Sequence, residues 1–190
     1  MEAVPPPHEN WKSALLAGRI ESSHVRQFGH LLGTIHRRSQ EERETIGPVF
    51  DDRTFFETLR VEPYYRYTAS KNPGVRDFFA ALIGDTEAAR ETLVHGDYSP
   101  KNILVHRDTL MLLDHEVIHF GDPAFDVGFA LTHLLSKDNH RVARRDSFLD
   151  AALVFWRTYR EAAGALASRA VVEARVVRHT LGCLLARVDG

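Results

Sequence analysis

Apolar residues recur at helical spacing along most of the chain. Between residues 24 and 38 they form one stripe made of Val25, Phe28, Leu31, Leu32 and Ile35. This period of three to four residues is typical of an amphipathic helix that buries one face. Similar stripes occur at 11–20, 51–59, 73–83, 123–135, 146–163 and 168–188. The pattern therefore predicts a largely helical chain.

Possible start signals precede several of these stripes. Ser22-Ser23, Asp51-Asp52 and Ser168 can each cap the helix that follows, and Pro123 is placed as a first helical residue. Two stretches between the stripes are predicted to be irregular. Residues 39–50 are polar and broken by Gly47-Pro48, and residues 61–72 carry three tyrosines without a regular pattern. We expect these tyrosines to pack over the core.

One segment has strand character instead. Ile103-Leu104-Val105 and Leu110-Met111-Leu112-Leu113 are short apolar runs separated by the polar turn at residues 106–109. Two such runs around a short turn are typical of a β-hairpin. The predicted fold class is therefore mainly α, with helices packed around a small β-hairpin sheet.

Composition narrows the class of protein. The chain has 190 residues, of which 44% are hydrophobic and 26% charged, with a formal net charge of −2. These values are ordinary for one globular domain or lobe. The small negative charge gives no basic field for nucleic acid or a membrane surface. No apolar run approaches the roughly 20 residues that span a bilayer, and the first residues do not form a signal peptide.

Cys183 is the only cysteine, and it lies in the apolar stretch 181–188. An intrachain disulfide is therefore impossible, which indicates a cytoplasmic location. We expect the Cys183 thiol to be a small core group rather than a nucleophile.

The candidate chemistry surrounds the predicted hairpin. Asp97 and Asn102 lie in the loop before it, and Asp114 ends its second strand, so the hairpin should return Asp114 to the neighbourhood of Asn102. A loop carboxylate such as Asp97 can accept a proton from an attacking hydroxyl. The oxygens of Asn102 and Asp114 suit Mg²⁺. A positioned nucleophile and a metal ion are the requirements of phosphoryl transfer.

Three motifs in this region resemble a known family. They are HGDYSPKNIL at 95–104, LDHE at 113–116, and GDP at 121–123 followed by DVG at 126–128. In this order and spacing they resemble the aminoglycoside phosphotransferase and choline kinase-like family, which has a protein-kinase-like α+β fold.

The resemblance implies roles for individual residues. Asp97 would be the catalytic base, and Asn102 and Asp114 would be the Mg²⁺ ligands. His95, Glu116 and Asp126 would support them. The implied cofactors are Mg²⁺ with ATP or GTP, and the implied partner is a small molecule that carries a hydroxyl group.

The resemblance covers only the C-terminal lobe of that family. Residues 11–190 would form this helical catalytic lobe. Residues 1–10 would be a hinge or linker, in which Met1, Glu2 and Val4 resemble the segment that pairs with adenine. Residues 1–190 do not contain the strand-rich N-lobe with a phosphate-binding lysine that members of this family have. We therefore expect a truncated or internally started product that is inactive alone, with the missing N-lobe as its possible partner. A separately encoded N-lobe is the alternative.

Two other interpretations start from the same residues. The chain could be a non-enzymatic kinase-like module that binds a ligand or a partner. His115-Glu116-Val117-Ile118-His119 also matches the zinc-hydrolase pattern H-E-x-x-H, which requires a helix. The β-branched pair Val117-Ile118 and the nearby Gly121-Asp122-Pro123 disfavour a helix there. Four acidic residues could attract a cationic substrate or could be ordinary solvated helix ends: Asp51, Asp52, Glu57 and Glu62.

Overall fold

The computed structural model describes residues 4–136 and 145–189. The strands are β1 (Glu9–Asn10), β2 (Thr92–Val94), β3 (Ile103–His106), β4 (Thr109–Leu112) and β5 (His119–Gly121). The α-helices are α1 (Trp11–Leu16), α2 (Ser22–Glu41), α3 (Arg43–Ile46), α4 (Thr54–Phe56), α5 (Tyr67–Lys71), α6 (Arg76–Ala88), α7 (Pro123–Leu135), α8 (Arg145–Ala163) and α9 (Ala170–Asp189). The other helical segments are η1 (Gly47–Phe50), η2 (Glu57–Arg66), η3 (Pro73–Val75), η4 (Pro100–Asn102) and η7 (Gly164–Leu166).

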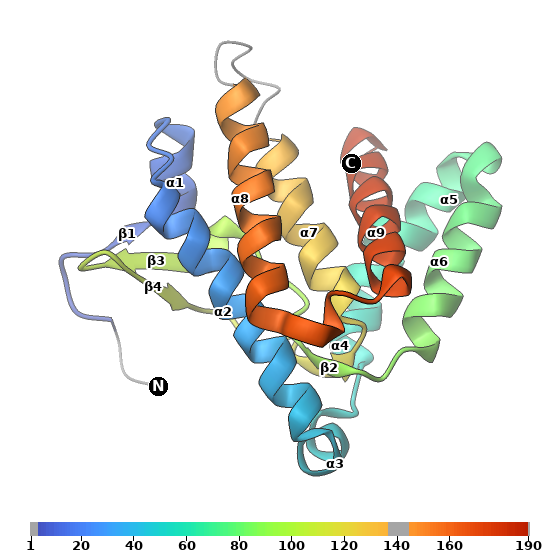
Figure 1. The fold of residues 1–190 in the computed structure, drawn as a ribbon. Coiled ribbons are helices and arrows are strands. Elements are labelled where there is room, and N and C mark those ends of the chain that lie inside the picture. The colour runs from blue at the N-terminus through green and yellow to red at the C-terminus, as the bar shows by residue number, and fades with distance from the viewer. Residues whose placement is uncertain (1–3, 137–144, 190) are drawn as a thin grey trace.

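Long helices form the centre of the molecule. α2 packs along α8, and α7 packs against both α8 and α9. The sheet of β1, β3 and β4 lies on one side of these helices, and α5 and α6 lie on the other, next to α9 (Figure 1). A Cβ added to Gly33 of α2 would lie 2.7 Å from the carbonyl oxygen of Tyr159 in α8. The absence of a side chain at Gly33 is therefore what lets these two helices approach so closely.

Two clusters of buried side chains make up the core. The larger one joins α2, α7 and α8 and includes Phe28, Leu32, Phe155 and Tyr159. The second lies between η2, α6, α7 and α9 and includes Phe56, Val61, Tyr65, Phe79, Phe125, Phe129 and Cys183. Cys183 is fully buried, as expected from its apolar surroundings in the sequence.

The predicted hairpin is present. β3 and β4 pair antiparallel from Ile103 opposite Leu112 to His106 opposite Thr109. Arg107 and Asp108 form the turn, with φ values of 48° and 58°. Positive φ at both central residues matches the twist of the strands on either side. β1 adds a third strand, with Glu9 opposite Val105, and β2 pairs with β5 in a separate sheet.

Several boundaries differ from the sequence-based prediction. The first helix ends at Leu16 rather than Ile20, the second extends to Glu41, and α9 begins at Ala170, beyond the predicted cap Ser168. The prediction that residues 61–72 are irregular was wrong. Residues 61–66 belong to the π-helical segment Glu57–Arg66 and residues 67–71 to α5, and burial of Val61 and Tyr65 in the second core cluster favours this helical path.

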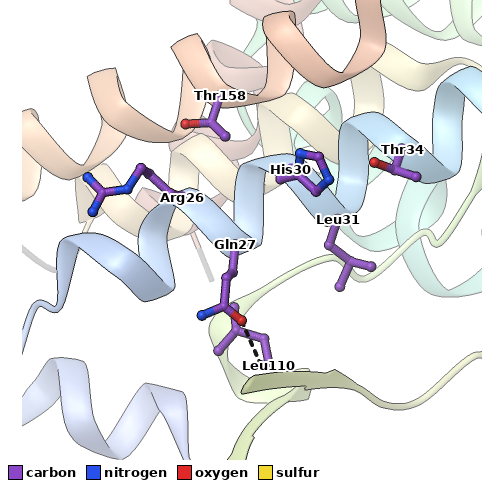
Figure 2. A pocket seen from close by; sticks show the side chains of 7 residues that line it. All are labelled: Arg26, Gln27, His30, Leu31, Thr34, Leu110 and Thr158. Atoms are coloured by element: carbon purple, nitrogen blue, oxygen red, sulfur yellow. Dashed lines mark hydrogen bonds between the residues drawn. The ribbon is translucent and has the colours of Figure 1, made fainter. Parts of the chain in front are cut away.

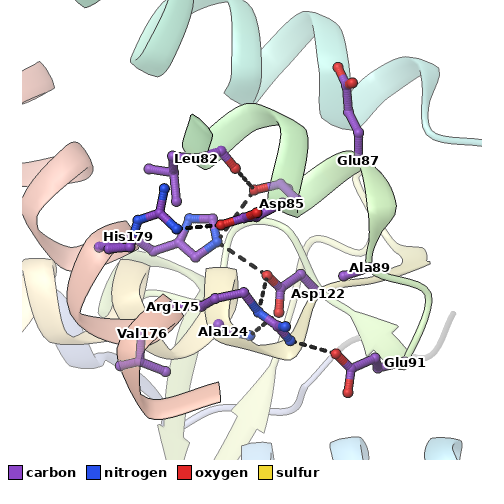
Figure 3. Close-up of polar contacts among 12 residues, drawn as sticks. Leu82, Asp85, Glu87, Ala89, Glu91, Asp122, Ala124, Arg175, Val176 and His179 are labelled. Atoms are coloured by element: carbon purple, nitrogen blue, oxygen red, sulfur yellow. Dashed lines mark hydrogen bonds and ion pairs between the residues drawn. The ribbon is translucent and has the colours of Figure 1, made fainter. Parts of the chain in front are cut away.

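A buried polar network ties α9 to the start of α7 (Figure 3). Oδ1 of Asp122 accepts the backbone N–H of Ala124 and caps α7. Its Oδ2 lies 2.9 Å from Nε of Arg175 and 3.4 Å from Nε2 of His179. Burial alone would raise the pKa of Asp122, but these two partners and the cap lower it. The carboxylate is therefore charged and holds both helices.

Within residues 4–136 and 145–189, no helix combines the length and the apolar character needed to cross a membrane.

Candidate active site

The loop between β2 and β3 carries Asp97, whose side chain is almost completely buried. Its Oδ2 lies 3.0 Å from Nη2 of Arg60 and 2.7 Å from Nζ of Lys101. Its Oδ1 is also buried but has no hydrogen-bond partner. The two oxygens of this carboxylate are therefore in different environments: one is paired with two cations, and the other is free to accept a hydrogen bond.

Asp126, on the first turn of α7, fixes the backbone of this loop. Its two oxygens accept the N–H groups of His95, at 2.7 Å, and of Gly96, at 2.9 Å. Burial alone would raise the pKa of Asp126, but His36, His95 and the hydrogen bonds lower it. A charged Asp126 therefore anchors the two residues that precede Asp97.

Gly96 could not be replaced by a larger residue in this conformation. Its φ is +76°, and an added Cβ would lie 2.6 Å from Cγ1 of Val117. Left-handed backbone and close approach both favour glycine. Glycine at position 96 is thus a requirement of the loop geometry.

The imidazole of His95 links the loop to the end of β4. Its Nε2–H donates to the carbonyl oxygen of Leu113 at 3.0 Å, and its Nδ1 accepts the N–H of Asp97 at 3.2 Å. Burial lowers the pKa of His95, so the ring stays neutral. Only a neutral ring can leave Nδ1 as an acceptor.

Asn102 and Asp114 both lie at the base of the hairpin. The Asn102 carbonyl oxygen accepts the N–H of Leu113 at 2.9 Å, which places Asp114 directly beside this rung. The Asn102 amide donates from Nδ2 to the Asp97 carbonyl oxygen at 3.0 Å, so its Oδ1 points away from that carbonyl. Asp114 is exposed, with φ +64°. An amide oxygen and an exposed carboxylate fit Mg²⁺, which takes oxygen ligands and completes its shell with phosphate and water.

The remaining predicted residues are placed as follows. Glu116 is exposed in the turn after Asp114. Val4 is half-buried. Met1 and Glu2 lie outside the described residues.

Sequence reasoning missed two side chains that touch Asp97. Lys101 lies four residues after Asp97 in the same motif, so its position could have been noticed. Arg60 is far from the motif in the sequence and comes from the π-helical segment η2. No sequence signal pointed to it, because tertiary packing alone brings η2 to the loop.

The H-E-x-x-H pattern does not form the helix that zinc hydrolases require. Residues 115–118 form a turn, and His119 begins β5. His115 is exposed beside the ring of His95, whereas His119 is buried against Phe56. The two imidazoles have separate surroundings, so the zinc interpretation gains no support from the geometry.

The four acidic residues considered as a substrate attractor have local partners. Asp52 accepts the N–H of Thr54, and Asp51 lies 3.7 Å from Arg90. Glu57 and Glu62 both pair with Arg66. These contacts favour ordinary surface roles over recognition of a cation.

A separate pocket of about 460 Å³ lies on the outer face of α2 (Figure 2). Its walls are formed by α2, by Leu110 of β4 and by Thr158 of α8. None of its lining residues belongs to the loop that carries Asp97. This pocket is therefore distinct from the candidate active site.

Comparison with known proteins agrees with the motifs. The sequence model of the phosphotransferase enzyme family matches residues 7–166. Two curated proteins, both named methylthioribose kinase, are similar over 198 aligned residues. They come from Klebsiella pneumoniae subsp. pneumoniae and from Enterobacter sp., and each is 24% identical. The alignments cover 85% of this chain and 49% of each relative.

The chain thus spans about half the length of these curated relatives. The family match, by contrast, extends over most of the chain and contains the whole loop, the hairpin and α7. The chain belongs to the phosphotransferase enzyme family.

Proposed function

We propose that this chain carries the catalytic residues of a kinase that phosphorylates a hydroxyl group of a small molecule. The hydroxyl oxygen forms a bond to the γ-phosphorus of ATP or GTP. The bond from that phosphorus to the β–γ bridging oxygen breaks, and the nucleoside diphosphate leaves. Asp97 accepts the hydroxyl proton.

The observation that carries this proposal is the state of the Asp97 carboxylate. Its Oδ1 is buried without a hydrogen-bond partner, and unpaired polar atoms of this kind are rare in folded proteins. A substrate hydroxyl would supply the missing partner. The loop backbone is already fixed by Asp126, so the base would not need to reorganise during the reaction.

Asn102 and Asp114 would hold Mg²⁺ through their side-chain oxygens. The ion, when bound, neutralises charge on the transferred phosphate. Glu116, two residues beyond Asp114, would act through water around the ion. His95 would keep the Asp97 loop and the end of β4 in a fixed relation through its two hydrogen bonds.

The acceptor is proposed from the relatives' names. Both are methylthioribose kinases, so a sugar-like molecule with a free hydroxyl is the first acceptor to test. We further propose that residues 11–190 act as the C-terminal lobe and residues 1–10 as the hinge, with Met1, Glu2 and Val4 near adenine. A nucleotide-binding N-lobe would then be needed for activity, and this chain alone would be inactive.

The test is a phosphotransfer assay with Mg²⁺ and ATP or GTP on a panel of hydroxyl compounds that includes methylthioribose. It compares the 190-residue protein with a version extended by any in-frame coding sequence before residue 1. We expect transfer by the extended protein only, and a loss of at least about 100-fold in Asp97→Asn.

Three results would contradict parts of this proposal. Unchanged transfer in Asp97→Asn would remove Asp97 as the base. Robust turnover by the 190-residue protein would remove the requirement for an N-lobe. Failure of both proteins with every acceptor would overturn the kinase assignment.

A further inference from the structure

The guanidinium of Arg60 contacts two consecutive residues of the catalytic loop. Nη2 lies 3.0 Å from Oδ2 of Asp97, and Nε donates to the carbonyl oxygen of Gly96 at 2.6 Å. Nη1 donates to the carbonyl oxygen of Leu59 at 2.8 Å. All three nitrogens therefore have acceptors, and the planar group is fixed in orientation as well as in position.

The surroundings of Arg60 also restrict its movement. Its side chain is only 11% exposed, and its guanidinium lies over the ring of Phe129, 6.0 Å from the centroid. It projects from η2, where Val61 and Tyr65 are buried in the second core cluster. π-Helical turns are rare and occur frequently at functional sites.

Lys101 provides an internal comparison. It also pairs with Oδ2 of Asp97, at 2.7 Å, but its side chain is 48% exposed. An exposed ammonium on a flexible stem can leave its partner at little cost. A buried guanidinium with three acceptors cannot, so Arg60 is the more firmly fixed of the two cations that pair with Asp97.

We propose that Arg60 is a positioning residue for Asp97. By holding Oδ2 and the Gly96 carbonyl together, it makes Oδ1 the oxygen that receives the substrate proton. Arg60 itself does not touch the substrate. This inference rests on the proposed phosphotransferase function for its catalytic consequence, but the contact between Arg60 and Asp97 can be tested without activity.

The first experiment measures the contact directly in the 190-residue protein. The carboxyl ¹³C resonance of Asp97 is assigned by its loss in Asp97→Asn. We expect it to move in Arg60→Ala and to return toward its original position when methylguanidine is added. Arg66→Ala is the matched control, because Arg66 lies on the same segment but pairs with Glu57 and Glu62 rather than with the catalytic loop.

The second experiment measures the consequence in the active protein. We expect Arg60→Ala to lower kcat on the order of 100-fold, as for other small misplacements of a catalytic group. KM for the nucleotide and the acceptor should change by less than about threefold. Methylguanidine should restore part of kcat in Arg60→Ala but none in Asp97→Asn. Arg66→Ala should behave as wild type.

The outcomes separate the two proposals. A shifted Asp97 resonance without any phosphotransfer by wild type would overturn the function and keep the role of Arg60. A raised KM with normal kcat in Arg60→Ala would make Arg60 a substrate-binding residue and overturn its positioning role. Equal positions of the Asp97 carboxyl resonance in Arg60→Ala and Arg66→Ala would also overturn the positioning role of Arg60. If Arg60→Ala does not fold, Arg60→Lys is the variant to measure, because one ammonium cannot reproduce the planar fork of the guanidinium. We expect a lowered kcat and a shifted Asp97 resonance in Arg60→Lys. Full kcat and an unmoved resonance in that variant would overturn the proposal.

Discussion

Asp126 and Gly96 are joined across 30 residues of sequence by a hydrogen bond of 2.9 Å from the Gly96 N–H to Oδ1 of Asp126. The other carboxylate oxygen accepts the N–H of His95 and lies 3.4 Å from Nε2 of His36. One buried side chain thus connects α7, α2 and the loop before Asp97. The position of the proposed base depends on this carboxylate as much as on its own neighbours.

Replacing Asp126 by asparagine should destabilise the fold. The amide keeps the shape of the side chain but removes the charge and turns an N–H₂ group toward a backbone N–H donor. We expect Asp126→Asn to lower the free energy of unfolding by about 3 kcal/mol in urea denaturation at neutral pH. Asp85→Asn is the control, because Asp85 makes an exposed ion pair with Arg178 and should cost less than about 1 kcal/mol. Equal losses in the two variants would contradict this account.

Asp126 should also contribute to the acid sensitivity of the fold. Its pKa is lowered in the folded protein, so the unfolded chain binds the proton more tightly. The stabilisation is complete above the unfolded value of about 3.9 and is lost as the pH falls through the lower folded pKa. Unfolding free energies measured between about pH 5 and about pH 2 should fall less steeply in Asp126→Asn than in wild type. An unchanged slope would show that other carboxylates dominate.

His119 should make the stability of the fold depend on pH in a higher range than Asp126 does. Burial lowers its pKa to about 4, although the bond from its Nδ1 to the Val117 carbonyl oxygen opposes the shift. In the unfolded chain the pKa is about 6.5, so protons bind to the unfolded state first as the pH falls. Stability should therefore decrease from about pH 6.5 toward pH 4, by about 3 kcal/mol in total.

The variant His119→Phe tests this pH dependence. It keeps a ring beside Phe56, whose centroid lies 4.2 Å from that of His119, and removes the titrating group. Thermal unfolding followed across this pH range should show a flatter profile in the variant. Retention of the wild-type slope would assign the effect to another group.

Replacement by alanine should change the free energy of unfolding in opposite directions at Gly33 and at Gly84. In Gly33→Ala the new Cβ would lie 2.7 Å from Cβ of Ala162, so α2 and α8 would have to separate. We expect a loss of about 1–3 kcal/mol in unfolding free energy. An added Cβ at Gly84, on α6, meets nothing within 4 Å, and Gly84→Ala should stabilise by about 0.5–1 kcal/mol. The packing explanation fails if both variants are stabilised.

The thiol of Cys183 should be unreactive in the folded protein. Burial raises its pKa to about 12, and the side chain is fully inaccessible. An aromatic disulfide reagent should label it only as fast as the chain unfolds. Ser70→Cys, which adds an exposed thiol on α5, should provide a fast reference signal in the same experiment. Labelling of Cys183 at a rate near that of the reference would mean that α9 opens locally.

Local patterns predicted the helices and the hairpin well because their signals are short-range. Helical spacing marked α2, α7 and α8, and the apolar runs around residues 106–109 marked β3 and β4. The second sheet was missed because β2 and β5 have only three residues each. The helical character of residues 61–71 was missed because no regular apolar period marks this segment, although Val61 and Tyr65 are buried in the second core cluster.

The sequence by itself determined the loop that carries Asp97 and the hairpin that brings Asp114 beside Asn102, since both depend on residues within about 20 positions of one another. Tertiary structure alone decided that Arg60 reaches Asp97 and which groups Asp126, already expected to support the loop, holds there: the N–H groups of His95 and Gly96. The reason is physical: hydrogen bonds between distant segments form only when packing of the helices brings their donors and acceptors together, and no local pattern of residues encodes that approach.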